Sequence, residues 1–164
     1  MSIGKAMLAE FDMEMTTTRK TLERVPGEKG AWKPHEKSFS LGHLAQLVAR
    51  MPGWLTLMLG NTEMDLGGGP GYSLETTETL LRVFDENVRE ARHALEQVGD
   101  ADLAVTWSLK MGGNVVMALP RKVVVRQTIN HLVHHRGQLS VYLRLLDVPV
   151  PSMYGPTADE PWGS

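Results

Sequence analysis

Residues 130–146 read NHLVHHRGQLSVYLRLL and hold three of the six histidines of the chain within five consecutive positions. Pro120 precedes a segment whose pattern predicts one helix over 121–146. On a helical wheel, at about 100° per residue, His131 and His135 fall in the middle of an apolar stripe. Leucines and valines flank this stripe on both sides. The helix therefore carries imidazoles where a core helix normally carries aliphatic side chains.

Paired histidines at positions i and i+4 stack one turn apart on the same helix face, so His131 and His135 could bind one metal ion together. His43 is the best candidate for a third ligand from a facing helix. Phe39 and Leu47, one turn before and one turn after it, are apolar and predict that His43 also faces inward. The alternative is a set of hydrogen-bonded core histidines. Burial without a partner costs about 1–3 kcal/mol per polar group, and a metal ion would supply that partner.

The other residues of this helix receive simpler interpretations. His134 is expected nearer the rim, and Arg136 is expected to form a structural salt bridge. Gly137 is expected to let a neighbouring helix approach closely. Gln138 lies on the histidine stripe, where two roles stay open: a hydrogen bond to a ligand histidine or bound water, and a polar group at a cavity edge.

Elsewhere in the chain, polar groups are predicted to be solvent-exposed. His35 falls in a loop and His93 falls off the apolar face of its helix, so both are expected at the surface. The acidic residues of the first helix, Glu10, Asp12 and Glu14, are also expected to be solvated, and no inward carboxylate stands out as a general acid or base.

Apolar periodicity of about 3.6 residues predicts four helices, over 3–24, 41–59, 74–98 and 121–146. Ser40 and Ser73 are the expected N-caps of the second and third helices. Pro52 predicts a kink or break near residues 50–51. The segment between Leu103 and Leu119 alternates on both sides of Gly112 and Gly113, so a short hairpin and a loop with turns both fit it. We therefore expect an all-α antiparallel four-helix bundle over 1–164 as a single domain, with a short hairpin before its last helix.

Composition excludes several classes of function. With 17 Lys and Arg against 19 Asp and Glu, the net charge is −2, which does not favour a nucleic-acid partner. No run of about 18 apolar residues predicts a membrane span. The chain has no cysteine, which fits a cytoplasmic protein and excludes thiolate ligands and a cysteine nucleophile.

The motifs SFSLGHLAQLV and, about 80 residues later, INHLVHHRGQLSVYLRLLDVPVP resemble the DinB/YfiT-like family of metal-dependent proteins. AWKP before the second helix is similar as well. The resemblance covers most of the chain, and its second motif is the more specific one. It implies a four-helix bundle, often dimeric, with a divalent metal held by three histidines and open to water. Carried over by position, the metal ligands are His43, His131 and His135.

The resemblance leaves the reaction open. Some relatives resemble transferases or isomerases that use a low-molecular-weight thiol. One hypothesis is therefore a metal-dependent enzyme, a thiol-dependent S-transferase or hydrolase acting on a small molecule. A second is a non-catalytic metal- or ligand-binding stress-response protein, and a third is a bundle whose histidines only form hydrogen bonds. Zinc, nickel, manganese and iron all remain candidates for the metal, and a homodimer is expected.

Overall fold

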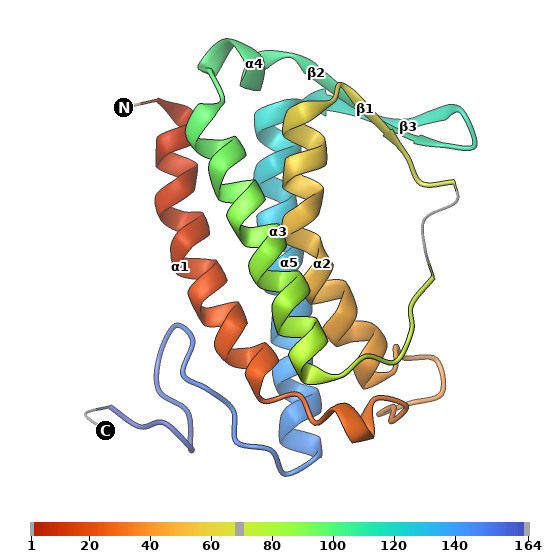
Figure 1. The fold of residues 1–164 in the computed structure, drawn as a ribbon, viewed down its shortest axis with the longest axis vertical. Helices are drawn as coiled ribbons and strands as arrows, with labels where there is room; N and C mark the ends of the chain where they lie inside the picture. The colour runs from red at the N-terminus through yellow and green to blue at the C-terminus, as the bar shows by residue number, and fades with distance from the viewer. Residues whose placement is uncertain (1, 68–70, 163–164) are drawn as a thin grey trace.

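The computed structural model describes residues 2–67 and 71–162, and most of them are helical. The long helices of this part of the chain are α1 (Ile3–Glu23), α2 (Leu41–Gly60), α3 (Thr77–Gln97) and α5 (Arg121–Leu145). A 3₁₀ turn, η1 (Gly27–Lys29), follows α1, and a short helix, α4 (Asp100–Ala104), follows α3. Figure 1 shows the long helices side by side, with the strands at one end. No helix in the described ranges is both long and apolar enough to cross a bilayer.

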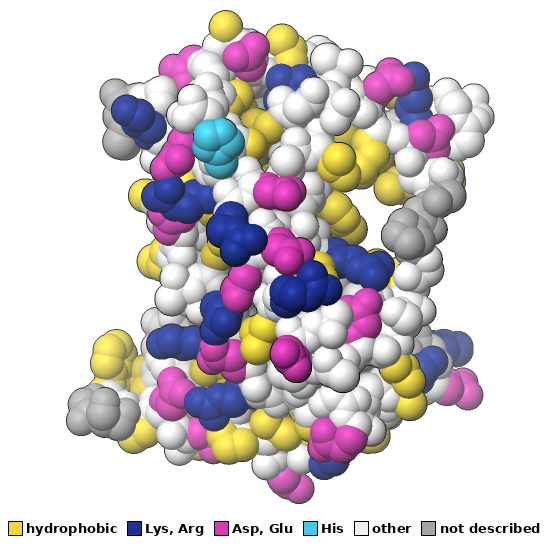
Figure 2. Space-filling view, in the orientation of Figure 1, with side chains coloured by type: hydrophobic (Ala, Val, Ile, Leu, Met, Phe, Trp, Pro, Cys, Tyr) yellow, Lys and Arg dark blue, Asp and Glu magenta, His cyan; other side chains and the backbone are white. Residues whose placement is uncertain are grey.

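Helix α2 is the centre of the core because it contacts both α3 and α5 extensively. Its buried side chains cover most of the helix surface, and one strip, with His43, Arg50, Trp54 and Leu57, is half-buried or exposed. Helix α1 packs on α3 and α5 and barely touches α2. Across the outer α1–α3 face, Arg19 pairs with Asp85 and Arg92 with Asp12. Figure 2 shows cationic and acidic side chains interspersed over this face, so it carries no patch of one sign.

A three-stranded sheet corrects the all-α prediction. It consists of β1 (Glu63–Asp65), β2 (Thr106–Met111) and β3 (Asn114–Pro120), in the order β1-β2-β3. Strands β2 and β3 form the antiparallel hairpin that the sequence allowed. Gly112 and Gly113 have φ angles of +57° and +81°, the left-handed conformation that a tight two-residue hairpin turn requires.

Strand β1 was not predicted, because it lies in a glycine-rich connection, residues 60–73, without apolar periodicity. It pairs in parallel with β2, with Met64 opposite Leu109. The carboxylate of Asp65 also accepts hydrogen bonds from the backbone N–H groups of Gly112 and Gly113. These contacts join segments more than 40 residues apart, so local sequence patterns do not show them. Residues 68–70 of this glycine-rich connection lie outside the described residues.

Two of the predicted helix signals need correction. Ser40 caps α2 as predicted, but Thr76 rather than Ser73 caps α3. Ser73 instead exchanges two hydrogen bonds with the buried amide of Gln46 on α2. Of the predicted kink or break near Pro52, the break is excluded, since α2 continues from Leu41 to Gly60. Buried apolar residues on both sides of Pro52 hold the two halves in place, and this packing offsets the one lost backbone hydrogen bond.

The C-terminal tail is attached to the core by a buried ion pair. Nη1 of Arg136 lies 2.7 Å from Oε2 of Glu14, and both side chains are almost completely buried. The hydroxyl of Tyr154 donates to Oε1 of Glu14 at 2.8 Å and accepts from Nη2 of Arg136 at 2.9 Å. The structural salt bridge predicted for Arg136 is confirmed. The prediction of a solvated Glu14 was wrong, because α1 turns this residue towards α5.

Candidate metal centre

Helix α5 brings His131 and His135 together as their spacing predicts. Their Nε2 atoms lie 2.8 Å apart, and their ring centroids 4.6 Å apart. The two residues differ in burial: His135 is 8% exposed, whereas His131 is exposed. The expectation that both lie in the middle of a buried stripe is therefore only half right. At His131 the helix faces a hollow beside Trp54 instead of a packed neighbour.

Gln138 fixes the protonation of His135. Its amide oxygen, Oε1, lies 2.8 Å from Nδ1 of His135. An amide oxygen can only accept a hydrogen bond, so Nδ1 carries the proton and Nε2 keeps its lone pair. When both rings are neutral, Nε2 of His135 accepts a hydrogen bond from Nε2 of His131. Of the two roles left open for Gln138, the hydrogen bond to a predicted ligand histidine is the one observed.

The same amide group also contacts His134. Nε2 of Gln138 lies 3.1 Å from Nε2 of His134, which accepts this hydrogen bond. His134 is exposed, as predicted for a residue near the rim, and its ring centroid lies 5.1 Å from that of His135. His35 and His93 are exposed as well, also as predicted. One glutamine therefore orients two of the three clustered imidazoles.

His43 lies on α2 and is half-buried. Its ring stacks between Tyr72, at a centroid distance of 3.6 Å, and Phe39, at 4.2 Å. Phe39 also lies 6.4 Å from the ring of His135, and its carbonyl accepts a hydrogen bond from the hydroxyl of Tyr142. Aromatic rings thus occupy both faces of His43. Phe39 was recognised in the sequence as an inward neighbour, but Tyr72 was missed because it follows a glycine-rich stretch without periodicity.

The structure tests how far these residues fit a metal ion. Nε2 of His131 and Nε2 of His135 face each other at hydrogen-bond distance. Over residues 2–67 and 71–162, no group of three or more His, Cys, Asp or Glu side chains is arranged to hold a metal. The two rings are therefore two candidate ligands on one helix, and His43 is not gathered with them in this conformation.

Burial and neighbouring charge favour neutral imidazoles at the site. Although part of its surface is exposed, neighbouring protein atoms partly desolvate His131 and lower its pKa, and His135 and His134 lower it further. Burial also lowers the pKa of His43, with a smaller contribution from Lys33. A neutral imidazole is the form that binds a metal, so these shifts extend the pH range in which both rings can act as ligands.

Two hollows lie beside the histidine pair. One, of about 390 Å³, has an apolar wall that includes Trp54 and ends at His131. The other, of about 340 Å³, has a mixed polar and apolar lining and lies beside His135 and Gln138. Ions and small molecules can therefore reach the pair from solvent.

The comparisons with known proteins agree with this architecture. A family model described as the DinB family matches residues 1–162. The chain belongs to the DinB family. This membership confirms the resemblance seen in the histidine motifs.

Relatives in the DinB family have similar length and fold. Among curated proteins, the uncharacterized protein YrdA of Bacillus subtilis (strain 168) is 24% identical over 158 residues, which cover 93% of this chain and 89% of YrdA. The crystal structure of a DinB-like protein from Bacillus cereus ATCC 10987 superposes with a TM-score of 0.71 at 20% identity, over 90% of this chain and 95% of that chain. A DinB-like protein of Bacillus subtilis, YjoA, gives a TM-score of 0.70 at 17% identity, over 89% and 96% of the two chains. These structural similarities show a shared fold.

Proposed function

We propose that this DinB-family protein binds one divalent metal ion through His131 and His135, with His43 as the third ligand. The observation that supports this most strongly is the 2.8 Å approach of the two Nε2 atoms, with His135 held in the tautomer that leaves its Nε2 lone pair free. Zinc, nickel, manganese and iron are the candidate ions. The antiparallel four-helix bundle and the homodimer expected from the sequence remain part of this proposal.

We further propose that the protein is an enzyme acting on a small molecule, with an S-transferase using a low-molecular-weight thiol as the favoured reaction. A divalent ion at such a site would lower the pKa of a bound thiol or water and so supply a nucleophile at neutral pH. The chain has no cysteine, so the thiol must come from solution. The thiol would release its proton to solvent, and its sulfur would form a bond to an electrophilic carbon of the substrate. The bond from that carbon to the leaving group would break, and the leaving group would depart with the electron pair.

The residues around the pair would orient it during such a reaction. Gln138 keeps the proton of His135 on Nδ1. Stacking by Phe39 and Tyr72 restricts the ring of His43. We propose a cytoplasmic location for this reaction, because low-molecular-weight thiols stay reduced there.

A non-catalytic binding protein is the second candidate. The described residues lining the hollow beside His135 are Lys37, Ser38, Phe39, His135, Gln138 and Tyr142. None of these is a carboxylic acid that could act as a general acid or base. This observation favours a protein that holds a metal or ligand without turnover.

Calorimetric titration of untagged, metal-free protein with Zn²⁺, Ni²⁺, Mn²⁺ and Fe²⁺ tests the metal site. We expect one equivalent of at least one ion for the wild type, none for His131→Ala and nearly one for the control His134→Ala. Absence of stoichiometric uptake by the wild type would contradict the proposal. Turnover of a thiol with an electrophile by the loaded protein, lost in His131→Ala, would then separate the enzyme from the binding protein.

A further inference from the structure

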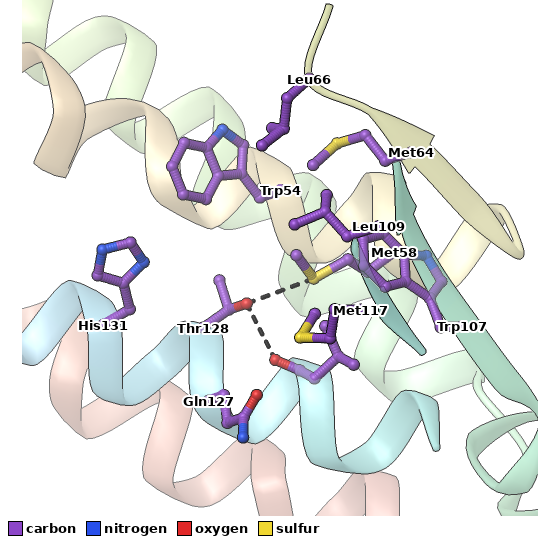
Figure 3. Close-up of a pocket in the computed structure, with 11 residues that line it drawn as sticks. Trp54, Met58, Met64, Leu66, Trp107, Leu109, Met117, Gln127, Thr128 and His131 are labelled. Carbon is purple, nitrogen blue, oxygen red and sulfur yellow. Dashed lines mark hydrogen bonds between the residues drawn. The ribbon is translucent and has the colours of Figure 1, made fainter. Parts of the chain in front are cut away.

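The hollow that ends at His131 is built by strand alternation as well as by helices. Side chains two residues apart on a strand face the same side, so Trp107 and Leu109 of β2 point the same way. Leu109 lies opposite Met117 on β3 and Met64 on β1. The three strands therefore present one continuous apolar row towards α2 and α5. Figure 3 shows this row around the hollow, with His131 and Trp107 at its two ends in this view.

Helices α2 and α5 complete the apolar pocket. Trp54 and Met58 of α2 form one wall, and the ring of Trp54 lies 6.1 Å from that of His131. The volume of about 390 Å³ is within the range of about 300–1,000 Å³ that is typical of small-molecule sites. Three methionines, Met58, Met64 and Met117, line it. Their flexible thioether side chains can adjust to ligands of different shape.

Few polar groups face this hollow, and none of the described residues lining it carries a charge at neutral pH. The hydroxyl of Thr128 lies within hydrogen-bond distance of its own helix, at 3.0 Å from the carbonyl of Val124, and of the sulfur of Met58 (Figure 3). Gln127 is exposed at the edge. His131 is thus the polar group that marks one end. A charged ligand group would be desolvated in this hollow without an ionic partner.

We infer that this hollow binds the uncharged, apolar part of a small-molecule substrate, aromatic or aliphatic, and directs the reactive end of that molecule towards His131. The description of the bound molecule as a substrate rests on the proposed function. Binding of the apolar group itself needs only the pocket formed by α2, α5 and the sheet. The inferred substrate class is therefore an apolar electrophile without charge on the part that is buried.

A matched pair of fluorescent probes tests the inference. N-phenyl-1-naphthylamine is uncharged, and 8-anilino-1-naphthalenesulfonate is the same ring system with one negative charge. With full-length protein, we expect the uncharged probe to bind at one site and the sulfonate to bind at least about tenfold more weakly, because its charge has no partner there. Failure of the wild type to bind the uncharged probe would overturn the inference, and so would equal affinity for the two.

A bulky side chain placed in the hollow should weaken binding of the uncharged probe. Met117→Trp should weaken binding of the uncharged probe at least about tenfold by occupying its space. Leu109→Trp, at the paired position on β2, provides a second variant that fills the hollow. Val116→Trp is the control, because Val116 is an exposed neighbour of Met117 that does not line the hollow. Circular dichroism identifies which variants fold, and unchanged affinity in a folded filling variant would overturn the inference.

Metal titrations on the same proteins separate this inference from the metal proposal. Met117→Trp should still take up its ion, and His131→Ala should still bind the uncharged probe within about threefold of wild type, since one wall residue of many is changed. Probe binding without metal uptake in the wild type would contradict the metal site and support the apolar binding site. Metal uptake without probe binding would support the metal site and overturn the inferred apolar binding site.

Discussion

Oε1 of Gln138 lies 2.8 Å from Nδ1 of His135, one turn away on α5, and this contact decides which nitrogen of His135 carries the proton. Groups that orient a ligand histidine typically contribute about 10–100-fold to metal affinity. Gln138→Ala should therefore weaken metal binding by about that factor in calorimetry. Gln138→Glu keeps an oxygen acceptor and should retain the affinity. Equal affinities for wild type and Gln138→Ala would show that the contact has no role in metal binding.

The lowered pKa of His131 predicts how the stability of the metal-free protein depends on pH. The ordinary histidine pKa, about 6.5, applies to the unfolded chain, and burial lowers the value in the folded protein. Between the two values the unfolded state binds more protons, so the free energy of unfolding should decrease as pH falls below about 6.5. The lowered pKa of His43 acts in the same direction.

Urea unfolding between pH 7.5 and 5.5 measures this effect. His131→Gln cannot titrate at this position, so its free energy of unfolding should decrease less steeply than that of the wild type. His93→Gln, at an exposed site, is the control and should follow the wild type. Parallel curves for His131→Gln and wild type would mean that the His131 pKa is not shifted on folding.

The ion pair between Arg136 and Glu14 should be costly to break from one side. Both side chains are nearly inaccessible, so Glu14→Ala leaves an unpaired buried guanidinium and should reduce stability by about 3–5 kcal/mol. The double variant Glu14→Leu/Arg136→Met should cost less than the sum of its single variants. Tyr154→Phe removes only a hydroxyl, whose partners are both charged, and should cost about 1.5–3 kcal/mol. A Glu14→Ala protein as stable as the wild type would contradict the buried pair.

Two glycines in helices should respond to alanine in opposite ways. A Cβ at Gly137 would meet no atom within 4 Å, so the predicted close approach of a neighbouring helix is wrong. Gly137→Ala should stabilise the protein by about 0.5–1 kcal/mol through its better helix propensity. At Gly53 the added Cβ would lie 2.7 Å from Oδ1 of Asn87, whose amide nitrogen donates to the carbonyl of Ala49. Gly53→Ala should therefore lower the melting temperature, and a rise would refute the clash.

Sequence patterns predicted most of the fold but not all of the site. Helix positions follow from local periodicity, and the pairing of His131 with His135 follows from their spacing on one helix. The pairing of β1 with β2 depends on contacts across about 45 residues, and such contacts leave no local pattern. Similarly, the stacking of His43 between Phe39 and Tyr72 depends on how the glycine-rich connection returns to α2. Side chains that loops bring together were the ones that sequence patterns could not place.

Strand β1 has a further consequence for the order in which the molecule opens. It spans only Glu63–Asp65, forms one edge of the sheet and pairs with β2 as its one neighbouring strand, with two further hydrogen bonds from the hairpin turn to Asp65. Short edge elements open with less free energy than a helical core, so the amide hydrogens of 63–66 should exchange with solvent before those of α2 and α5. Met64 leaves the wall of the hollow whenever this strand separates. Local opening of this strand thus creates an entrance to the apolar hollow, while the histidine-bearing helix stays folded.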